Sequence, residues 1–204
     1  MKKFGILDYG LSNLLSLERA LRLFGVNPVY VNKSEDIKKI DVLIIPGDGA
    51  FKSGMEGIRK RKLTRSIKDH FRKNKPILGI CLGMQILFTK GYEFGACEGL
   101  NIIKGKVIKF PQLNNIKIPH IGWNELKVKK VSNLLGENQS IVYFVHSYIC
   151  FPEDKKIVLA TTKHDEVEFN SVIGFGNVFG CQFHPEKSGD DGMKILKKFV
   201  TMYL

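Results

Sequence analysis

The sequence predicts a three-layer α/β protein, in which a mostly parallel central sheet has helices on both faces and the second half is strand-rich. In the first half, short apolar runs without polar interruptions alternate with helical patterns, which is typical of parallel strands buried on both faces. In the second half, strand-like runs follow one another before a final amphipathic helix. The 204 residues contain no linker, repeat or low-complexity tract, so we expect one domain over residues 1–204.

The first half supplies the expected parallel strands. Right-handed crossovers between such strands bring their carboxyl ends to one edge of the sheet, where sites in this class are built. The expected strands cover residues 3–8, 29–31, 41–45 and 76–80.

Helices are expected between these strands. Ser12 or Asn13 can cap a helix that runs to Phe24, with Gly25 as its stop. The expected helices continue over residues 59–75, where apolar residues recur every fourth position, and over residues 82–89.

The second half is expected to add strands and to close with a helix. The strands are predicted over residues 102–110, 126–131, 140–145, 157–162, 171–175 and 177–183, and the helix over residues 189–202.

The net charge of +12 is concentrated in residues 59–75, on the outer face of the predicted helix. A solvated surface is the favoured interpretation, with an acidic partner or a phosphorylated substrate as the alternative. No combination of basic and aromatic residues indicates nucleic acid as a partner.

The lengths of the apolar runs and the spacing of the cysteines exclude several further classes of protein. No run approaches the roughly 20 apolar residues of a membrane span, and none fits a signal peptide, so we expect a cytoplasmic protein without membrane attachment. The four cysteines are far apart, which argues against a zinc site or a disulfide framework, and we expect no metal or cofactor. One reactive thiol among buried ones remains possible.

Cys81 is the candidate for that thiol. It lies in Gly79-Ile80-Cys81-Leu82-Gly83, a G-x-C-x-G sequence between a predicted strand and a predicted helix. This is the cysteine counterpart of the serine nucleophile elbow. The glycines allow close approach of neighbouring chains, and the start of a helix favours the thiolate. A buried structural cysteine is the alternative interpretation.

A thiolate nucleophile needs a base, and the base needs an orienting group. His184 and Glu186 follow the last predicted strand, with Pro185 between them. In an extended segment residues i and i+2 point to the same side, so the carboxylate can orient the imidazole toward the thiol. The pattern therefore predicts a Cys81–His184–Glu186 triad.

A third requirement is a hole for the developing negative charge. The glycine-rich segment Pro46–Phe51 follows the third predicted strand. Its backbone at Asp48 and Gly49, together with the Leu82 amide, could donate to an oxyanion. A plain turn is the alternative for this segment.

These motifs together resemble the class I, triad-type glutamine amidotransferases. The resemblance rests on residues 76–85 and 183–188. Residues 119–124 and 143–148 make the chain similar to the glutaminase subunits of imidazole glycerol phosphate synthase, and the resemblance covers essentially the whole chain.

The resemblance implies a function and further roles. Glutamine would be hydrolysed through a thioester on Cys81, and the ammonia would pass to a (β/α)₈-barrel cyclase subunit in a heterodimer. By the same resemblance, the glutamine-binding residues would be Gly49, Gln85, Ser147 and Tyr148, and the partner interface would include Asn13, Trp123 and Lys187.

Two departures from the family pattern leave alternatives open. Asp48 stands where the family commonly has an apolar residue, which could alter the oxyanion segment or leave a catalytically silent binding subunit. Residues 163–167 stand where many relatives carry a Tyr-Gly turn, and residues 91–100 resemble paralogues that supply ammonia for the amidation or amidination of a surface sugar. A different cysteine hydrolase, such as a peptidase, is the third alternative, and Gln85 one turn after Cys81 favours glutamine over it.

Overall fold

The computed structural model of the chain describes residues 2–11, 13–112, 116–136 and 140–204. In these residues, the central sheet has eight strands in the order β2-β1-β3-β4-β14-β13-β12-β9. The first five of this order run parallel, and β13, β12 and β9 extend the sheet by antiparallel pairs. The strands are β1 Phe4–Leu7, β2 Val29–Val31, β3 Val42–Ile45, β4 Ile77–Ile80, β9 Lys127–Val128, β12 Val158–His164, β13 Val167–Phe175 and β14 Val178–Cys181.

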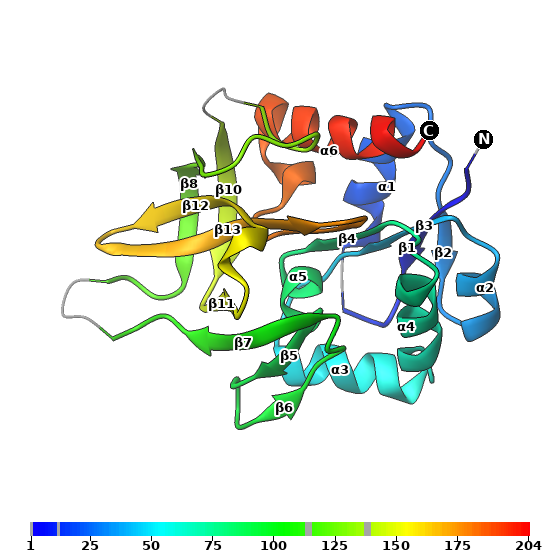
Figure 1. Cartoon of the computed structure of the whole chain (residues 1–204), viewed down its shortest axis with the longest axis horizontal. Coiled ribbons are helices and arrows are strands. Elements are labelled where there is room, and N and C mark those ends of the chain that lie inside the picture. The colour runs from blue at the N-terminus through cyan, green and yellow to red at the C-terminus, as the bar shows by residue number, and fades with distance from the viewer. Residues whose placement is uncertain (1, 12, 113–115, 137–139) are drawn as a thin grey trace.

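Two smaller sheets lie beside the central one (Figure 1). One has the order β11-β7-β5-β6, and the other is the antiparallel pair β10-β8. Their strands are β5 Phe88–Gly91, β6 Cys97–Glu98, β7 Ile103–Lys109, β8 His120–Glu125, β10 Ile141–His146 and β11 Tyr148–Pro152. The strand-rich second half of the prediction is therefore confirmed.

Helices cover both faces of the central sheet, as predicted. Figure 1 shows α1 and α6 on one side of the parallel strands and α3 and α4 on the other. Consecutive residues of a strand supply opposite faces: Val42 and Ile44 of β3 pack into the core beneath α1 and α6, and Leu43 and Ile45 into the opposite core. The helices are α1 Leu14–Arg22, α2 Ser34–Lys38, α3 Phe51–Lys60, α4 Thr64–Arg72, α5 Leu82–Ile86 and α6 Gly189–Tyr203. Two short 3₁₀ turns are η1 Lys155–Ile157 and η2 Pro185–Lys187.

The prediction of one basic helix over residues 59–75 was wrong, because two helices share that stretch. Lys62 adopts a left-handed backbone with φ +55, which ends α3. The Leu63 N–H then donates to Ile58 O at 3.0 Å, a bond of the kind that closes a helix C-terminus, before α4 begins at Thr64. The apolar residues at fourfold spacing, Leu63, Ile67 and Phe71, all follow Lys62, but the basic residues run across it, which is why the sequence alone suggested continuity.

The helix predicted over residues 82–89 is also shorter than expected. It ends at Ile86, and Phe88 already belongs to β5, which pairs with β7. Strands β5, β6, β8 and β11, helix α2 and most of helix α3 were not predicted. The strands are short and depend on pairing with other strands for their stability, so their own residues give a weak signal.

Two further predictions need correction. The strand predicted over residues 126–131 is reduced to β9, because the N–H groups of Lys129 and Lys130 both turn to Leu159 O, at 2.8 and 3.1 Å. Asn13 immediately precedes α1, but its side chain makes no capping hydrogen bond. Ser12, the other predicted cap, lies outside the described residues.

Apart from these differences, the predicted strand and terminal-helix bounds differ from the observed ones by a few residues. Across the described ranges, no helix combines the length and the apolar character needed to span a bilayer.

Helix α5 packs closely against the end of β3, and Gly83 is the residue at this contact. A Cβ added to Gly83 would lie 1.7 Å from Ile45 O, so a side chain there has no room unless the backbone shifts. Gly79, at the end of β4, is similarly close to the chain: its Cβ would lie 2.7 Å from Gly83 O. These glycines allow β4 to turn directly into α5 beside β3.

We therefore expect Gly83→Ala to lower the free energy of unfolding by about 2–3 kcal/mol, because overpacking must displace β3 or α5. Urea unfolding of the two proteins measures this change. Gly136→Ala is the matched control, since its new Cβ would meet only the end of the Lys198 side chain at 3.1 Å. Equal stability of the Gly83 and Gly136 variants would contradict the packing argument.

Candidate active site

Cys81 occupies a strained turn between β4 and α5. Its backbone has φ +52 and ψ −110, a conformation that non-glycine residues rarely adopt. The Cys81 N–H donates to Cys181 O at 2.8 Å, which ties the turn to β14. The side chain is 5% exposed and lines a cavity of about 400 Å³. A buried thiol that reaches a cavity from a strained backbone is typical of a nucleophile held for reaction.

His184 and Glu186 lie beside this thiol, at the end of β14. Glu186 Oε1 accepts a hydrogen bond from His184 Nδ1 at 2.9 Å, and both side chains are buried. The contact does not arise from an extended segment, as the sequence argument assumed. Only His184 is extended, and the 3₁₀ turn η2 brings the Glu186 carboxylate back to the imidazole.

The charges around His184 favour its protonated form. Burial alone would lower the pKa of His184, but the neighbouring Cys81 and Glu186 outweigh this effect and raise the pKa to about 10. His184 Nε2 makes no aligned hydrogen bond, although Asp48 Oδ1 approaches it to 3.2 Å. The imidazole therefore lies between two carboxylates, one facing each nitrogen.

The segment Pro46–Gly49 packs against the turn at Cys81. The Leu82 N–H donates to Gly47 O at 3.3 Å, and the Asp48 N–H donates to Leu11 O at 3.2 Å. Two of the amides that the sequence suggested for an oxyanion hole are therefore engaged elsewhere. The Gly49 N–H donates to none of the described residues, and its φ of +107 is a glycine conformation.

The buried Tyr9 side chain holds the segment Pro46–Gly49 in place from the protein interior. Its hydroxyl donates to Pro46 O at 2.6 Å. Burial raises the pKa of Tyr9 far above its ordinary value, with smaller contributions from Cys81 and Asp48, so the phenol remains a neutral donor. A Cβ at Gly47 would lie 2.0 Å from the Tyr9 oxygen, which explains why a glycine is needed there.

The cavity collects the residues that the resemblance assigned to glutamine. Gln85 is buried, and its side-chain amide donates to Tyr148 O and to Gln182 Oε1, both at 3.2 Å. Gln182 in turn donates to Cys81 Sγ at 3.7 Å. The predicted residues on the cavity wall are Asp48, Gly49, Cys81, Leu82, Gln85, Ser147 and Tyr148.

Glu93 is a cavity residue that the sequence argument missed. It follows β5, and its Oε2 accepts a hydrogen bond from the Phe51 N–H at 2.7 Å. Burial raises the pKa of Glu93. Phe94, beside it on the cavity wall, is 80% exposed. A Glu within a turn between two short strands carries no sequence signal of its own, because only the fold brings it to the same cavity as Cys81.

The residues predicted to meet a partner all lie on the surface. Trp123 of β8 is 55% exposed and packs its ring 5.8 Å from that of Tyr143. Asn13 and Lys187 are exposed as well. Ile121, two positions before Trp123 on the same face of β8, is a further exposed apolar side chain that the sequence argument did not select.

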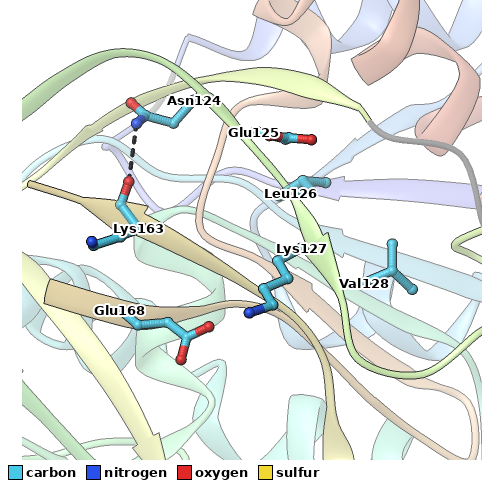
Figure 2. A pocket seen from close by; sticks show the side chains of 7 residues that line it. All are labelled: Asn124, Glu125, Leu126, Lys127, Val128, Lys163 and Glu168. Carbon is cyan, nitrogen blue, oxygen red and sulfur yellow. Dashed lines mark hydrogen bonds between the residues drawn. The ribbon is translucent and has the colours of Figure 1, made fainter. Parts of the chain in front are cut away.

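A second, larger cavity of about 790 Å³ lies away from Cys81. Figure 2 shows its charged wall, with Lys127, Lys163 and Glu168 and with the Asn124 amide donating to the Lys163 carbonyl. The described part of its wall includes no cysteine or histidine, so it offers no nucleophile or base of the kind seen at Cys81. Among the residues that the structure describes, no group of three His, Cys, Asp or Glu side chains is arranged to hold a metal ion.

Comparisons with known proteins agree with this site. The family model described as "Glutamine amidotransferase class-I" matches residues 5–202. A crystal structure of a glutamine amidotransferase shares the fold with a TM-score of 0.77 at 17% identity, over 98% of this chain and 97% of the other. The chain belongs to the class-I glutamine amidotransferase family, which confirms the resemblance noted in the sequence.

Two relatives narrow this assignment to the HisH subunits of imidazole glycerol phosphate synthase. The HisH subunit of Caldanaerobacter subterraneus subsp. tengcongensis is 47% identical over 200 residues, which are 97% of each chain. That of Lactococcus lactis subsp. lactis is 46% identical over 203 residues, or 98% of each chain.

The raised pKa of His184 predicts how stability depends on pH. The folded protein keeps the proton up to about pH 10, whereas an unfolded histidine releases it near its ordinary value of 6.5. The resulting stabilisation is complete below about pH 6.5 and is lost as the pH rises through about 10. We expect the difference in free energy of unfolding between the wild type and His184→Gln to shrink over this interval.

Urea unfolding at several pH values across that interval measures the difference. Cys81→Ser is the control, because removing the thiol that raises the pKa of His184 should move the loss to lower pH. A difference between wild type and His184→Gln that stays constant with pH would rule out the proposed charge state.

Proposed function

We propose that this chain is the glutaminase subunit of an imidazole glycerol phosphate synthase. It would hydrolyse glutamine to glutamate and ammonia and deliver the ammonia to a synthase subunit. The observation that carries the proposal is the buried Cys81 thiol on a strained turn, beside a His184–Glu186 pair that holds a proton. Membership in the class-I amidotransferases and similarity to HisH subunits support the same assignment.

The reaction follows from the charges of the three groups. The Cys81 thiolate attacks the side-chain carboxamide carbon of glutamine and forms a tetrahedral intermediate. His184 gives its Nε2 proton to the leaving nitrogen, the C–N bond breaks, and ammonia departs from a glutamyl thioester. Glu186, which accepts from Nδ1, keeps the imidazole oriented.

Water completes the cycle. It attacks the thioester carbon while His184 takes one of its protons, and the C–S bond then breaks. This step releases glutamic acid, which loses its proton to solvent, and restores both the thiolate and the imidazolium.

Other cavity residues would hold the substrate. Glu93 offers a carboxylate to the α-ammonium group of glutamine. Gln85, Ser147, Tyr148 and Gly49 would contact the remainder of the molecule, and the hydrogen bonds of Gln85 to Tyr148 O and Gln182 keep that part of the wall in place.

The oxyanion segment must change before turnover. Asp48 and Leu82 direct their amides at Leu11 O and Gly47 O, so neither faces a substrate in this arrangement. A rotation of the backbone at Gly49, which a glycine permits, would turn an amide toward the cavity. We propose that docking of the partner drives this rotation.

The proposed partner is a (β/α)₈-barrel cyclase that forms a heterodimer with this chain. Asn13, Trp123 and Lys187 would contact it, and ammonia would pass between the subunits without reaching solvent. We place the complex in the cytoplasm, where four free cysteines stay reduced. The names of the relatives support this pathway over the alternative of supplying ammonia for a surface sugar.

Cys81→Ser tests the division of labour. We expect the variant complex to lose essentially all glutamine-dependent synthesis of imidazole glycerol phosphate, because the alcohol is a far weaker nucleophile than the thiolate. Synthesis from added ammonium should persist, since the ammonia-consuming chemistry belongs to the partner. Loss of both activities would contradict the proposal, as would wild-type complex that releases no glutamate from glutamine.

Asp48→Val tests the role of the unusual carboxylate. Asp48 Oδ1 competes for the proton on His184 Nε2, so we expect faster glutamine hydrolysis by the variant in complex with its partner. Initial rates of glutamate release measure this. Asp48→Asn keeps the shape of the side chain but removes its charge and should share the increase. Rates identical to the wild type in both variants would show that Asp48 has no influence on the segment.

A further inference from the structure

A chain of hydrogen bonds crosses the protein behind the cavity wall. His120 Nε2 lies 2.7 Å from Asn124 Oδ1, and His120 Nδ1 lies 3.1 Å from His146 Nε2. His146 Nδ1 lies 2.9 Å from Tyr148 O. The chain therefore has three links, and two histidines are the only members that can supply protons to all of them.

The two ends of this chain can only accept. The Asn124 amide nitrogen donates to Lys163 O at 3.1 Å, as Figure 2 shows, so its oxygen faces His120. Reversing the amide would place two oxygens against each other. The backbone oxygen of Tyr148 has no proton to give. His120 Nε2 and His146 Nδ1 must therefore both carry hydrogen.

The middle link then lacks a proton if both imidazoles are neutral. A neutral imidazole has one N–H and one bare nitrogen. With their outer nitrogens protonated, His120 Nδ1 and His146 Nε2 would face each other as two lone pairs at 3.1 Å. One additional proton between them completes all three links and gives the pair a single positive charge.

Aromatic rings surround the site of this charge. The His120 ring stacks between Phe144, at 4.9 Å, and His164, at 4.0 Å. Phe110 and Phe169 lie 5.2 and 5.0 Å from the His146 ring. The Phe144 ring lies nearly parallel to that of His120, at 24°, and such a ring face attracts a cation, which offsets part of the cost of burying one.

Some charged and titratable groups near the pair favour its protonated form, and others oppose it. Asp165 favours the charged form of His120 and His164 opposes it, and His164 and His184 oppose the charged form of His146. Burial lowers the pKa of His120, and it lowers that of His146 to about 3. Loss of the shared proton would leave His120 Nδ1 and His146 Nε2 facing each other as two lone pairs at 3.1 Å. Repulsion between two lone pairs in a buried site works against that outcome.

A positive charge on this histidine pair would act on a ligand bound in the Cys81 cavity. Among the described residues, its wall includes the carboxylates of Asp48 and Glu93 and no lysine or arginine. Glutamine brings an α-carboxylate as well as an α-ammonium group. The His184 imidazolium already faces Cys81 and Glu186, so His146, which lies on the wall next to Ser147, is the remaining source of positive charge among the described wall residues.

We propose that His120 and His146 share one proton at neutral pH and that the resulting charge behind Ser147 and Tyr148 selects substrates with an α-carboxylate. This inference rests on the proposed glutaminase function and adds a specificity determinant to it. The two histidines act through the field on the cavity wall, because all four of their nitrogens are engaged in the chain and make no direct contact with substrate.

Calorimetric binding to the Cys81→Ser chain tests the proposal without requiring turnover. The two probes are L-glutamine and its α-amide, which lacks the carboxylate charge. His120→Gln replaces the imidazole with a neutral amide. We expect it to weaken L-glutamine binding by about tenfold, as the loss of one buried charge near the ligand predicts, and to leave α-amide binding unchanged. His164→Gln, which removes a stacked ring outside the chain, should change neither.

The pH dependence has a defined sign. Raising the pH removes the shared proton, so the affinity of the Cys81→Ser chain for L-glutamine should fall more steeply than that of the same chain carrying His120→Gln, with the titration of the ligand itself common to both. Equal losses for both probes in His120→Gln, or no loss for either, would overturn the proposal. Failure of the parent chain to bind L-glutamine at all would instead contradict the proposed function.

Nitrogen-15 NMR of histidine-labelled wild-type protein provides a test that does not depend on the variant folding. At neutral pH we expect the signals of His120 Nδ1 and His146 Nε2 to report one proton shared by the two nitrogens. Two unprotonated nitrogens at these positions would overturn the proposal even if glutamine binds normally.

Discussion

The close approach of the Cys81 turn to the end of β3 is the contact on which the site depends. Gly83 lies so near Ile45 O that only a glycine fits, and the Leu82 N–H reaches Gly47 O. This contact gives Cys81 its strained backbone and places the Pro46–Gly49 segment beside the thiol. Tyr9, through its bond to Pro46 O, holds the segment from the core. Strain at the nucleophile is therefore maintained by packing on two neighbouring strands.

A balance of buried charges follows from this geometry. Taking the His184 imidazole out of water disfavours its charge, yet Cys81 and Glu186 are close enough to reverse the effect. Asp48 adds a second carboxylate on the nitrogen that must deliver the proton. The same residue has its amide bonded to Leu11 O, so movement of its backbone and release of its carboxylate from His184 are coupled. A single residue thereby links the oxyanion segment to the base.

Residues of β8 and β10 contribute to both the surface and the interior. Alternation along β8 exposes Ile121 and Trp123 and turns His120 inward to meet His146 of β10. One strand pair thus connects the predicted partner surface with the wall that carries Ser147 and Tyr148.

The sequence by itself determined the fold class, the strands flanking the Cys81 turn and the proximity of His184 and Glu186 to the end of a neighbouring strand. Those features are encoded locally, in apolar runs, glycines and spacing, and the rules of parallel sheets bring strand ends together. Only the tertiary structure decided the rest. It broke the basic helix at Lys62, brought Glu93 to the cavity and turned Asp48 toward His184. It also joined His120 to His146 across two strands. Each of these depends on contacts between residues far apart in the chain, whose geometry is fixed only when the strands pair and the core packs.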